Sequence, residues 1–264
     1  MPRRYIDLSV SLETGVASDP PMMLPEIEYL DHQQTAEQVM MFFPGLKKDD
    51  LPGGEGWAIE RLNIATHNGT HVDAPYHYHS TMNKGERAIT IDEVPLEWCF
   101  GNGVKFDFRT LPDGHLVTPD EIDAELARIG HDLQPLDIVL VNTSAGGAYG
   151  AADYLMRGCG FGRDATNHLT SKGVRMVGTD AWSWDAPFGH TAQAYAKSGD
   201  ASIIWEGHRA GMDQGYCQIE KMTNLDLLPD TGFTVSAFPF KIKAASAGFT
   251  RAVAIVEEQP MRVI

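Results

Sequence analysis

The amino-acid sequence predicts an α/β protein with a substantial sheet that is curved and partly barrel-like. Two patterns indicate this fold class: short runs of β-branched residues that end at turn residues, and a helix signal that lies among them. The runs cover residues 138–141, 174–177, 233–235 and 252–256, and we interpret each one as a strand. More than one strand order is compatible with this pattern.

A helix is predicted to begin at Thr118. The string at residues 118–121 reads Thr-Pro-Asp-Glu, which supplies a hydroxyl for the N-cap, a proline for the first position and a carboxylate for the third. Ile122, Leu126 and Ile129 then recur on one helix face. We therefore expect an amphipathic helix that packs this face against the sheet.

The chain is expected to form a single domain over residues 1–264. Its 264 residues are 43% hydrophobic, which is sufficient for one sizeable core. The sequence contains no internal repeat or low-complexity linker that divides it. A formal net charge of −15 argues against nucleic acid as a partner, because phosphate binding requires a clustered positive surface.

The N-terminal residues and the cysteines indicate the compartment. Residues 2–10 lack the continuous apolar run of a signal peptide or a membrane helix, so no membrane association is expected. Cys99, Cys159 and Cys217 are widely spaced and odd in number, which fits a reducing interior better than a disulfide framework. We expect a cytoplasmic protein.

Residues 36–57 are interpreted as a long loop with an apolar tip. Met-Met-Phe-Phe at residues 40–43 precedes Lys-Lys-Asp-Asp at 47–50, and glycine and proline follow. Such a loop can serve as a lid or as an oligomer contact. The alternative is an ordinary surface excursion that packs on its own domain.

Four of the ten histidines fall between residues 67 and 79. Residues 62–64 are interpreted as a strand, and Asn68-Gly69 as a turn, which would put His67 at a strand end. An extended segment after the turn would direct His71 and Asp73 to one face, because strand side chains alternate, and Pro75 would end the pairing.

Imidazole nitrogens and a carboxylate oxygen form a ligand set that suits zinc, manganese or iron. The cluster contains no cysteine, which favours a catalytic site with an open coordination position over a structural zinc site. His77 or His79 would then be free to transfer protons. The alternative is that these histidines cap turns or lie in satisfied polar packing.

The spacing of this segment resembles the signature of the bacterial cyclase family, which includes bacterial kynurenine formamidases and isatin hydrolases. The matching residues are His67, Gly69, Thr70, His71, Asp73, Pro75 and His77. Residues 178–180 and 220–229 are similar to later blocks of the family, so the resemblance covers most of the chain. It implies a single-domain swivelling β/β/α fold.

The resemblance also implies functional roles and a cofactor of one or two divalent ions, Mn²⁺ or Zn²⁺. The implied metal ligands are His67, His71, Asp73, His208 and Glu220, with His77 as general acid or base and Gln214 as a further candidate ligand. Alternation over residues 216–220 puts Glu220 opposite apolar Ile219, in agreement with a pocket-facing carboxylate, although a surface position is the alternative. His79 is expected to have a supporting or surface role.

The implied activity is hydrolysis of a small amide, with isatin-like ring opening favoured and N-formylkynurenine as the alternative substrate. A metal-dependent lyase or dehydratase, and a non-catalytic ligand-binding module, are further alternatives. Trp182, Trp184 and Phe188 are candidate walls for the small-molecule substrate, or else core residues. The string Asp-Ala-Pro-Phe-Gly-His at residues 185–190 is similar to Asp-Ala-Pro-Tyr-His at residues 73–77, but we interpret it as loop packing and not as a second site. The family also implies a homodimer or homotetramer.

Overall fold

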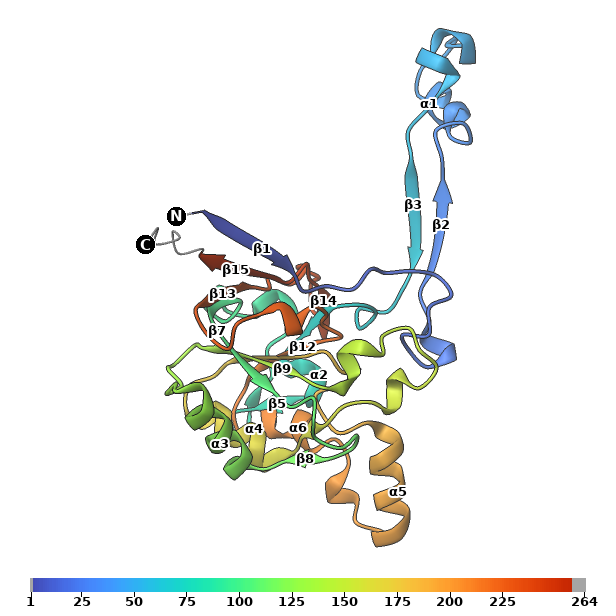
Figure 1. Cartoon of the computed structure of the whole chain (residues 1–264). Coiled ribbons are helices and arrows are strands. Elements are labelled where there is room, and N and C mark those ends of the chain that lie inside the picture. The colour runs from blue at the N-terminus through green and yellow to red at the C-terminus, as the bar shows by residue number, and fades with distance from the viewer. Residues whose placement is uncertain (1, 258–264) are drawn as a thin grey trace.

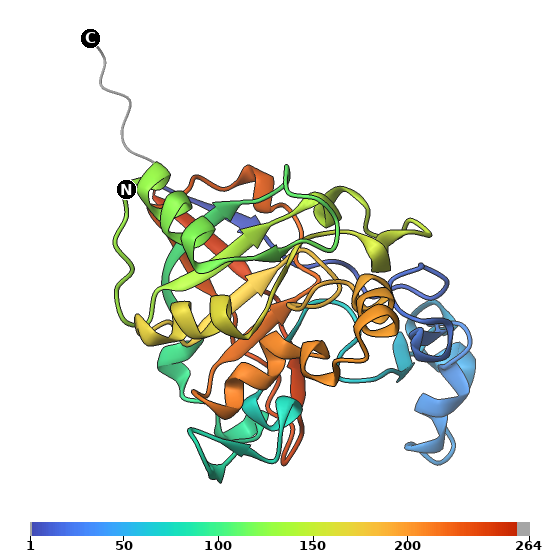
Figure 2. The same cartoon turned by 90° about the horizontal axis from the view of Figure 1, so that it is seen from below.

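The computed structural model describes residues 2–257 and contains a curved, nine-stranded mixed sheet (Figures 1 and 2). In spatial order its strands are β1 (Arg3–Asp7), β15 (Val253–Glu257), β13 (Phe233–Ser236), β7 (Phe100–Asp107), β9 (Ile138–Asn142), β11 (Met176–Thr179), β12 (Cys217–Glu220), β4 (His71–Asp73) and β14 (Ala247–Phe249). The predicted α/β class and curved sheet are confirmed.

The centre of the sheet is parallel and both flanks are antiparallel. Strands β7, β9, β11 and β12 run in one direction, whereas β12 pairs antiparallel with β4, and β4 with β14. All four predicted strands form, although the one predicted at residues 174–177 begins two residues later. Just before its start, the Arg175 guanidinium donates to the carbonyls of Thr170 and Val174, and the Arg175 carbonyl accepts from the Cys217 N–H.

Two hydrophobic clusters cover the two faces of the sheet. On β9, Ile138 and Leu140 belong to one cluster, and Val139 and Val141 to the other, as strand alternation requires. The second face is covered by α3 (Pro119–Ile129) and α4 (Arg163–Ser171) (Figure 2). A fully buried aliphatic side chain of this kind contributes about 1.5–3 kcal/mol to stability.

Helix α3 confirms the predicted helix start at Thr118. The Thr118 hydroxyl accepts from the Glu121 backbone N–H, and the Glu121 carboxylate accepts from the Thr118 backbone N–H, so the two residues form a capping box. Ile122 and Leu126 are buried in the core. The helix ends at Gly130, whose φ of 72° is a backbone conformation that glycine adopts without strain.

Residues 26–63 form an arm that projects from the body of the protein (Figure 1). Strands β2 (Glu26–Leu30) and β3 (Ile59–Asn63) pair only with each other, and α1 (Ala36–Met41) lies in the tip. The predicted long loop is therefore a hairpin with a helical tip, and it does not pack on its own domain. The strand predicted at residues 62–64 belongs to this hairpin.

Short elements complete the fold. They are α2 (Pro75–Tyr78), α5 (Phe188–Ser198), α6 (Glu206–Arg209), β5 (Thr81–Met82), β6 (Glu86–Arg87), β8 (Leu116–Val117) and β10 (Gly160–Phe161), joined by 3₁₀ turns. The longest helices have 11 residues, so within residues 2–257 none has the length and apolar character to cross a bilayer.

Candidate metal centre

The floor of the candidate site is built where β4 pairs with β12. In this antiparallel register Glu220 lies opposite His71, and Ile219 lies opposite Val72. Val72 and Ile219 point into the hydrophobic core, so alternation directs His71, Asp73 and Glu220 to the other face of the sheet. All three polar side chains are buried there.

His67 lies in a tight turn over residues 65–68, so its predicted position at a strand end is wrong. The Asn68 backbone N–H donates to the Ala65 carbonyl, and the Asn68 side-chain oxygen accepts from the Ala65 N–H. This local bonding separates the turn from β3 and directs His67 toward β4. Its Nδ1 lies 2.9 Å from Asp73 Oδ1.

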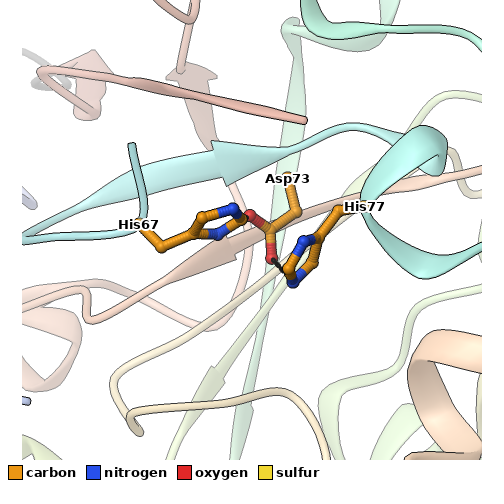
Figure 3. Close-up of side chains that lie close together, drawn as sticks. All are labelled: His67, Asp73 and His77. Atoms are coloured by element: carbon orange, nitrogen blue, oxygen red, sulfur yellow. Dashed lines mark ion pairs between the residues drawn. The ribbon is translucent and has the colours of Figure 1, made fainter. Parts of the chain in front are cut away.

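His77 approaches Asp73 from the other side (Figure 3). Pro75 ends the strand, as predicted, and starts the short helix α2. His77 then lies one helical turn beyond Asp73, with Nε2 3.9 Å from Asp73 Oδ2. The rings of His67 and His77 lie 4.0 Å apart between centroids, so both imidazoles face one carboxylate.

His208 completes the group from helix α6. Its Nε2 lies 3.7 Å from Glu220 Oε1 and 3.9 Å from Asp73 Oδ2. Its Nδ1 lies 2.5 Å from Asp185 Oδ2, and this carboxylate also accepts the backbone N–H groups at the start of α6. A carboxylate at Nδ1 leaves Nε2 as the free ligand atom, the arrangement that metal-binding histidines commonly use.

The residues present fit a divalent cation. Two sets of three ligand atoms, each set within 4.8 Å, share Asp73: one includes His67 and His77, and the other includes His71 and Glu220. Within residues 2–257, neither Asp73 oxygen nor His71 Nε2 has a partner with hydrogen-bond geometry, although His67 Nδ1 and His71 Nε2 lie 2.9 Å and 3.2 Å from Asp73 Oδ1. Buried polar atoms are costly without a partner, and a cation would satisfy all three.

Burial and mutual charge shift the pKa values of the floor. Burial disfavours the charged forms, but the neighbouring histidines outweigh it at Asp73 and hold the pKa of that carboxyl well below its usual range. Burial and the Asp73 charge raise the pKa of Glu220, while Asp73 overcomes burial to raise the pKa of His71. Asp73 is therefore the principal anion of the site.

The pKa of His77 is shifted in the opposite direction to that of His71. Burial lowers the pKa of His77 to about 3 despite the attraction of Asp73, and the nearby His67 and His208 rings lower it further. The imidazole is thus neutral near pH 7 and can accept a proton. Its side chain is 24% exposed, whereas the Asp73 side chain is fully enclosed, so His77 borders the pocket as well as the floor.

A cavity of about 240 Å³ opens above these side chains. Its walls are mainly apolar and include Met23, Trp182, Phe188 and Trp205. Trp182 and Phe188 meet edge to face with ring centroids 5.2 Å apart, and Trp205 stacks on the His208 ring at 4.4 Å. The combination is a polar floor beneath walls that suit a flat, apolar molecule.

Comparisons with known proteins identify the family. Residues 6–186 match the Cyclase family model, whose description is "Putative cyclase". The chain belongs to the cyclase family. This confirms the resemblance that the histidine signature indicates, because the match contains the whole segment from His67 to His79.

Two curated members of the cyclase family are similar in sequence to this chain. The kynurenine formamidase of Maricaulis maris (strain MCS10) is 27% identical over 205 residues, which are 74% of this chain and 79% of that protein. The kynurenine formamidase of Erythrobacter litoralis (strain HTCC2594) is 26% identical over 197 residues, covering 74% and 76%.

Solved structures share the fold of this cyclase-family chain. Isatin hydrolase A from Labrenzia aggregata, bound to benzyl benzoate, has a TM-score of 0.74 at 24% identity and covers 97% of this chain and 94% of its own. Isatin hydrolase A from Ralstonia solanacearum has a TM-score of 0.75 at 22% identity, with 97% and 92% covered.

Two of the side chains predicted for this cyclase-family site lie outside it. The Gln214 amide contacts the Thr170 carbonyl and the Arg175 guanidinium, so it does not join the metal ligands. Trp184 is buried in the core, where it stacks on Phe161, and does not line the cavity. Only the Trp184 ring is turned away, because its backbone N–H donates to Glu220 Oε1 at 3.0 Å and so contacts a candidate ligand.

Other predictions agree with the structure. Trp182 and Phe188 line the cavity, and His79 is exposed with Nδ1 bonded to Thr81, as a surface role requires. The interpretation of residues 185–190 as loop packing missed Asp185, which orients His208. Trp205 was also missed as a residue of the cavity wall, because its stacking on His208 is made by the fold and has no signal in the sequence.

Proposed function

We propose that this protein is a metal-dependent hydrolase of a small amide, acting on cyclic aromatic amides by isatin-like ring opening. The observation that carries the proposal is the Asp73 carboxylate, which is fully buried, unsatisfied at both oxygens and shared by two sets of ligand atoms. Buried charge of this kind is characteristic of functional sites, because stability alone does not favour it.

His71, Asp73 and Glu220 would hold the cation from the two paired strands, with His67 and His208 supplying nitrogen atoms from the sides. A divalent cation bound there would polarise the amide carbonyl and lower the pKa of a water molecule. The protein contributes rigid placement, since the β4–β12 register fixes His71 against Glu220, and Asp185 fixes the His208 ring.

His77 would move the protons. Its ring is neutral near pH 7, and the charge of the neighbouring Asp73 carboxylate would favour the imidazolium formed when the ring accepts a proton from the water that attacks the carbonyl carbon. The C–N bond then breaks, and the protonated ring returns the proton to the departing nitrogen. Asp73, 3.9 Å from His77 Nε2, stabilises the transient imidazolium without taking the proton itself.

The cavity walls favour an aromatic amide. Trp182, Phe188 and Trp205 offer ring faces and edges around a space of about 240 Å³, and flat rings pack well against such surfaces. An amide attached to or fused with the ring would then reach the polar floor. The apolar walls would also lower the local dielectric constant around the reacting carbonyl and so strengthen the electrostatic interactions with the floor.

Arylformamidase activity on N-formylkynurenine is the second candidate. It is favoured by the two curated relatives, both kynurenine formamidases, each matched over 74% of this chain. Both reactions add water across a C–N bond at the same floor. They differ in whether the amide lies within a ring, which the shape of the walls would decide.

The test is a mass-detected screen of the purified protein loaded with Mn²⁺ or Zn²⁺. Isatin, other cyclic amides, N-formylkynurenine and simple formanilides would be incubated in ¹⁸O-labelled water. Ring opening of a cyclic amide with one solvent oxygen gained supports the first proposal, and release of formate from N-formylkynurenine supports the second. A product formed without added water indicates a lyase, and no product with any amide contradicts both proposals.

A further inference from the structure

Asp19 is a buried carboxylate outside the predicted site that gathers one donor from its neighbour Ser18 and three donors from distant parts of the chain. It accepts from Ser18 Oγ at 3.0 Å, Asn68 Nδ2 at 3.1 Å and Trp182 Nε1 at 3.0 Å, and it pairs with Lys221 Nζ. The residue is only 5% exposed. One side chain thus joins the N-terminal segment, the His67 turn and a wall of the cavity.

Each donor is adjacent to a functional part of the site. Asn68 follows His67 and closes the turn that aims it. Lys221 follows Glu220, and its ammonium also donates to the His67 carbonyl at 2.8 Å. Trp182 forms part of the cavity wall. Asp19 therefore lies one contact away from two candidate ligands and from the aromatic wall.

The backbone at Lys221 shows that the surroundings impose this pairing. Its φ of 56° is a left-handed conformation that residues with a long side chain rarely adopt. Such conformations persist when neighbouring contacts determine them, and they concentrate at functional sites. The Lys221 backbone N–H donates to the Ala181 carbonyl, and its ammonium pairs with Asp19. The backbone and the side chain of this residue, which directly follows β12, are therefore both held.

The same network also fixes the N-terminal wall. Asn68 Nδ2 donates to the Met23 carbonyl at 2.8 Å as well as to Asp19, and Asp19 and Met23 both line the cavity. Residues 19–23 would otherwise be held mainly by a 3₁₀ turn at Pro21–Met23, which has no buried residue. The wall and the His67 turn consequently share one anchor.

The geometry points to Asp19 as a positioning residue that, through Asn68 and Lys221, holds His67 in reach of Asp73 and closes the N-terminal side of the cavity. The side chains that bond to Asp19 are Ser18, Asn68, Trp182 and Lys221, and none of them is a candidate ligand. Supporting contacts of this kind commonly change metal affinity by 10–100-fold when they are removed. The metal-affinity part of this inference rests on the proposed function.

The test uses the double variant Asp19→Asn/Lys221→Met. Removing Asp19 alone would leave the Lys221 charge buried and unpaired, which can prevent folding, whereas removing both charges avoids this penalty. Asp7→Asn is the matched control, because it removes the exposed Asp7–Arg251 ion pair from the sheet edge. Titration calorimetry with Mn²⁺ and Zn²⁺ and hydrogen exchange on the folded proteins are the two measurements.

In the double variant we expect the dissociation constant for the ion to rise about 10-fold. Amide exchange should accelerate over residues 18–23 and 65–70 and stay unchanged over α3, and Asp7→Asn should leave both measurements unchanged. Unchanged affinity together with unchanged local exchange in the double variant would overturn the inference. If the parent protein binds neither ion, the proposed function fails, and exchange over residues 18–23 and 65–70 alone decides the role of Asp19.

Discussion

The projecting arm and the floor of the cavity distribute their side chains in opposite ways. On the arm, Tyr29, Phe42 and Phe43 are 63%, 68% and 59% exposed although they are apolar. On the floor, His71 and Asp73 are fully buried although they are polar. Each region is unfavourable when considered alone, because apolar surface in water and unsatisfied polar groups in the interior both cost free energy.

The comparison shows how differently two unfavourable regions are supported. The floor is embedded in the nine-stranded sheet, which holds its side chains in place at the cost of burying them. The arm has only its own two strands, and an isolated two-stranded hairpin is marginally stable in water. We infer that the floor is organised for a bound cation and the arm for contact with another copy of the chain.

The largest effect is expected from Asp73→Asn, which removes the shared anion of the floor. Bound Mn²⁺ or Zn²⁺ and turnover should both fall by more than the roughly 100-fold that loss of a supporting contact costs. Asp123→Asn is the control, since it removes a carboxylate that pairs with a histidine, His168, outside the cavity. His71→Ala should also lose metal. Full metal content in both Asp73→Asn and His71→Ala would remove the floor as a metal site.

His77→Ala should lower turnover by about 10²–10⁴-fold while metal content is retained, the usual range for loss of a general acid or base. Because His77 Nε2 also fits one ligand set, calorimetry separates the two roles: a ligand would lower metal affinity instead. His79→Ala should change turnover much less, as its side chain is exposed. Equal turnover in His77→Ala and the parent protein would contradict the proton-transfer role.

A smaller effect, on stability, is expected at the end of the neighbouring strand β11. Burial raises the pKa of Asp180 to about 7, so the folded state holds a proton between about pH 4 and pH 7 that the unfolded chain releases. Stability should therefore fall as pH rises through this window, by at most about 1.4 kcal/mol per pH unit. Asp180→Asn should flatten that dependence.

The measurement for Asp180 is urea unfolding of both proteins at pH 5, 6, 7 and 8. A parent protein whose stability falls no more steeply than that of Asp180→Asn would show that the carboxyl is ionised throughout. In that case the buried Asp180 carboxylate would be stabilised by its own hydrogen bonds from Thr143, unlike the Asp73 carboxylate of the floor.

The smallest effect on the folded chain is expected at the arm tip. Phe42→Ser/Phe43→Ser should convert a dimer or tetramer into a monomer by light scattering at micromolar concentration, since these side chains are exposed. The free energy of unfolding of each subunit should change by no more than about 0.5 kcal/mol. A parent protein that is already monomeric at this concentration would contradict the proposed contact.

The sequence predicts those features whose causes are local. Helix α3 is predictable because its capping box and its apolar face lie within a dozen residues. The pairing of His71 with Asp73 follows from alternation along one short strand. His208 and Glu220 were expected only from the family resemblance, because the contacts that bring them to Asp73 are made by the fold.

The remaining site residues depend on tertiary contacts that no local pattern contains. Asp19 acts through donors up to 202 positions away, and Asp185 acts on His208, 23 positions along the chain. The loop predicted at residues 36–57 is the tip of the arm, and the alternation at residues 62–64 indicated only the end of β3, so the pairing of β2 with the distant β3 was not predicted. The features that the sequence did not predict thus depend on contacts between residues far apart in the chain.

The facing positions of His71 and Glu220 have a consequence for how this site can change during evolution. Their alignment depends on the pleat of two strands, and a shift of one residue in β4 or β12 would turn every side chain of that strand to the opposite face. Substitutions in place can therefore alter the ligand set gradually. A single-residue insertion or deletion within either strand would exchange the ligands with Val72 or Ile219 in one step, whereas a change of length in a connecting segment such as the arm would leave this register intact.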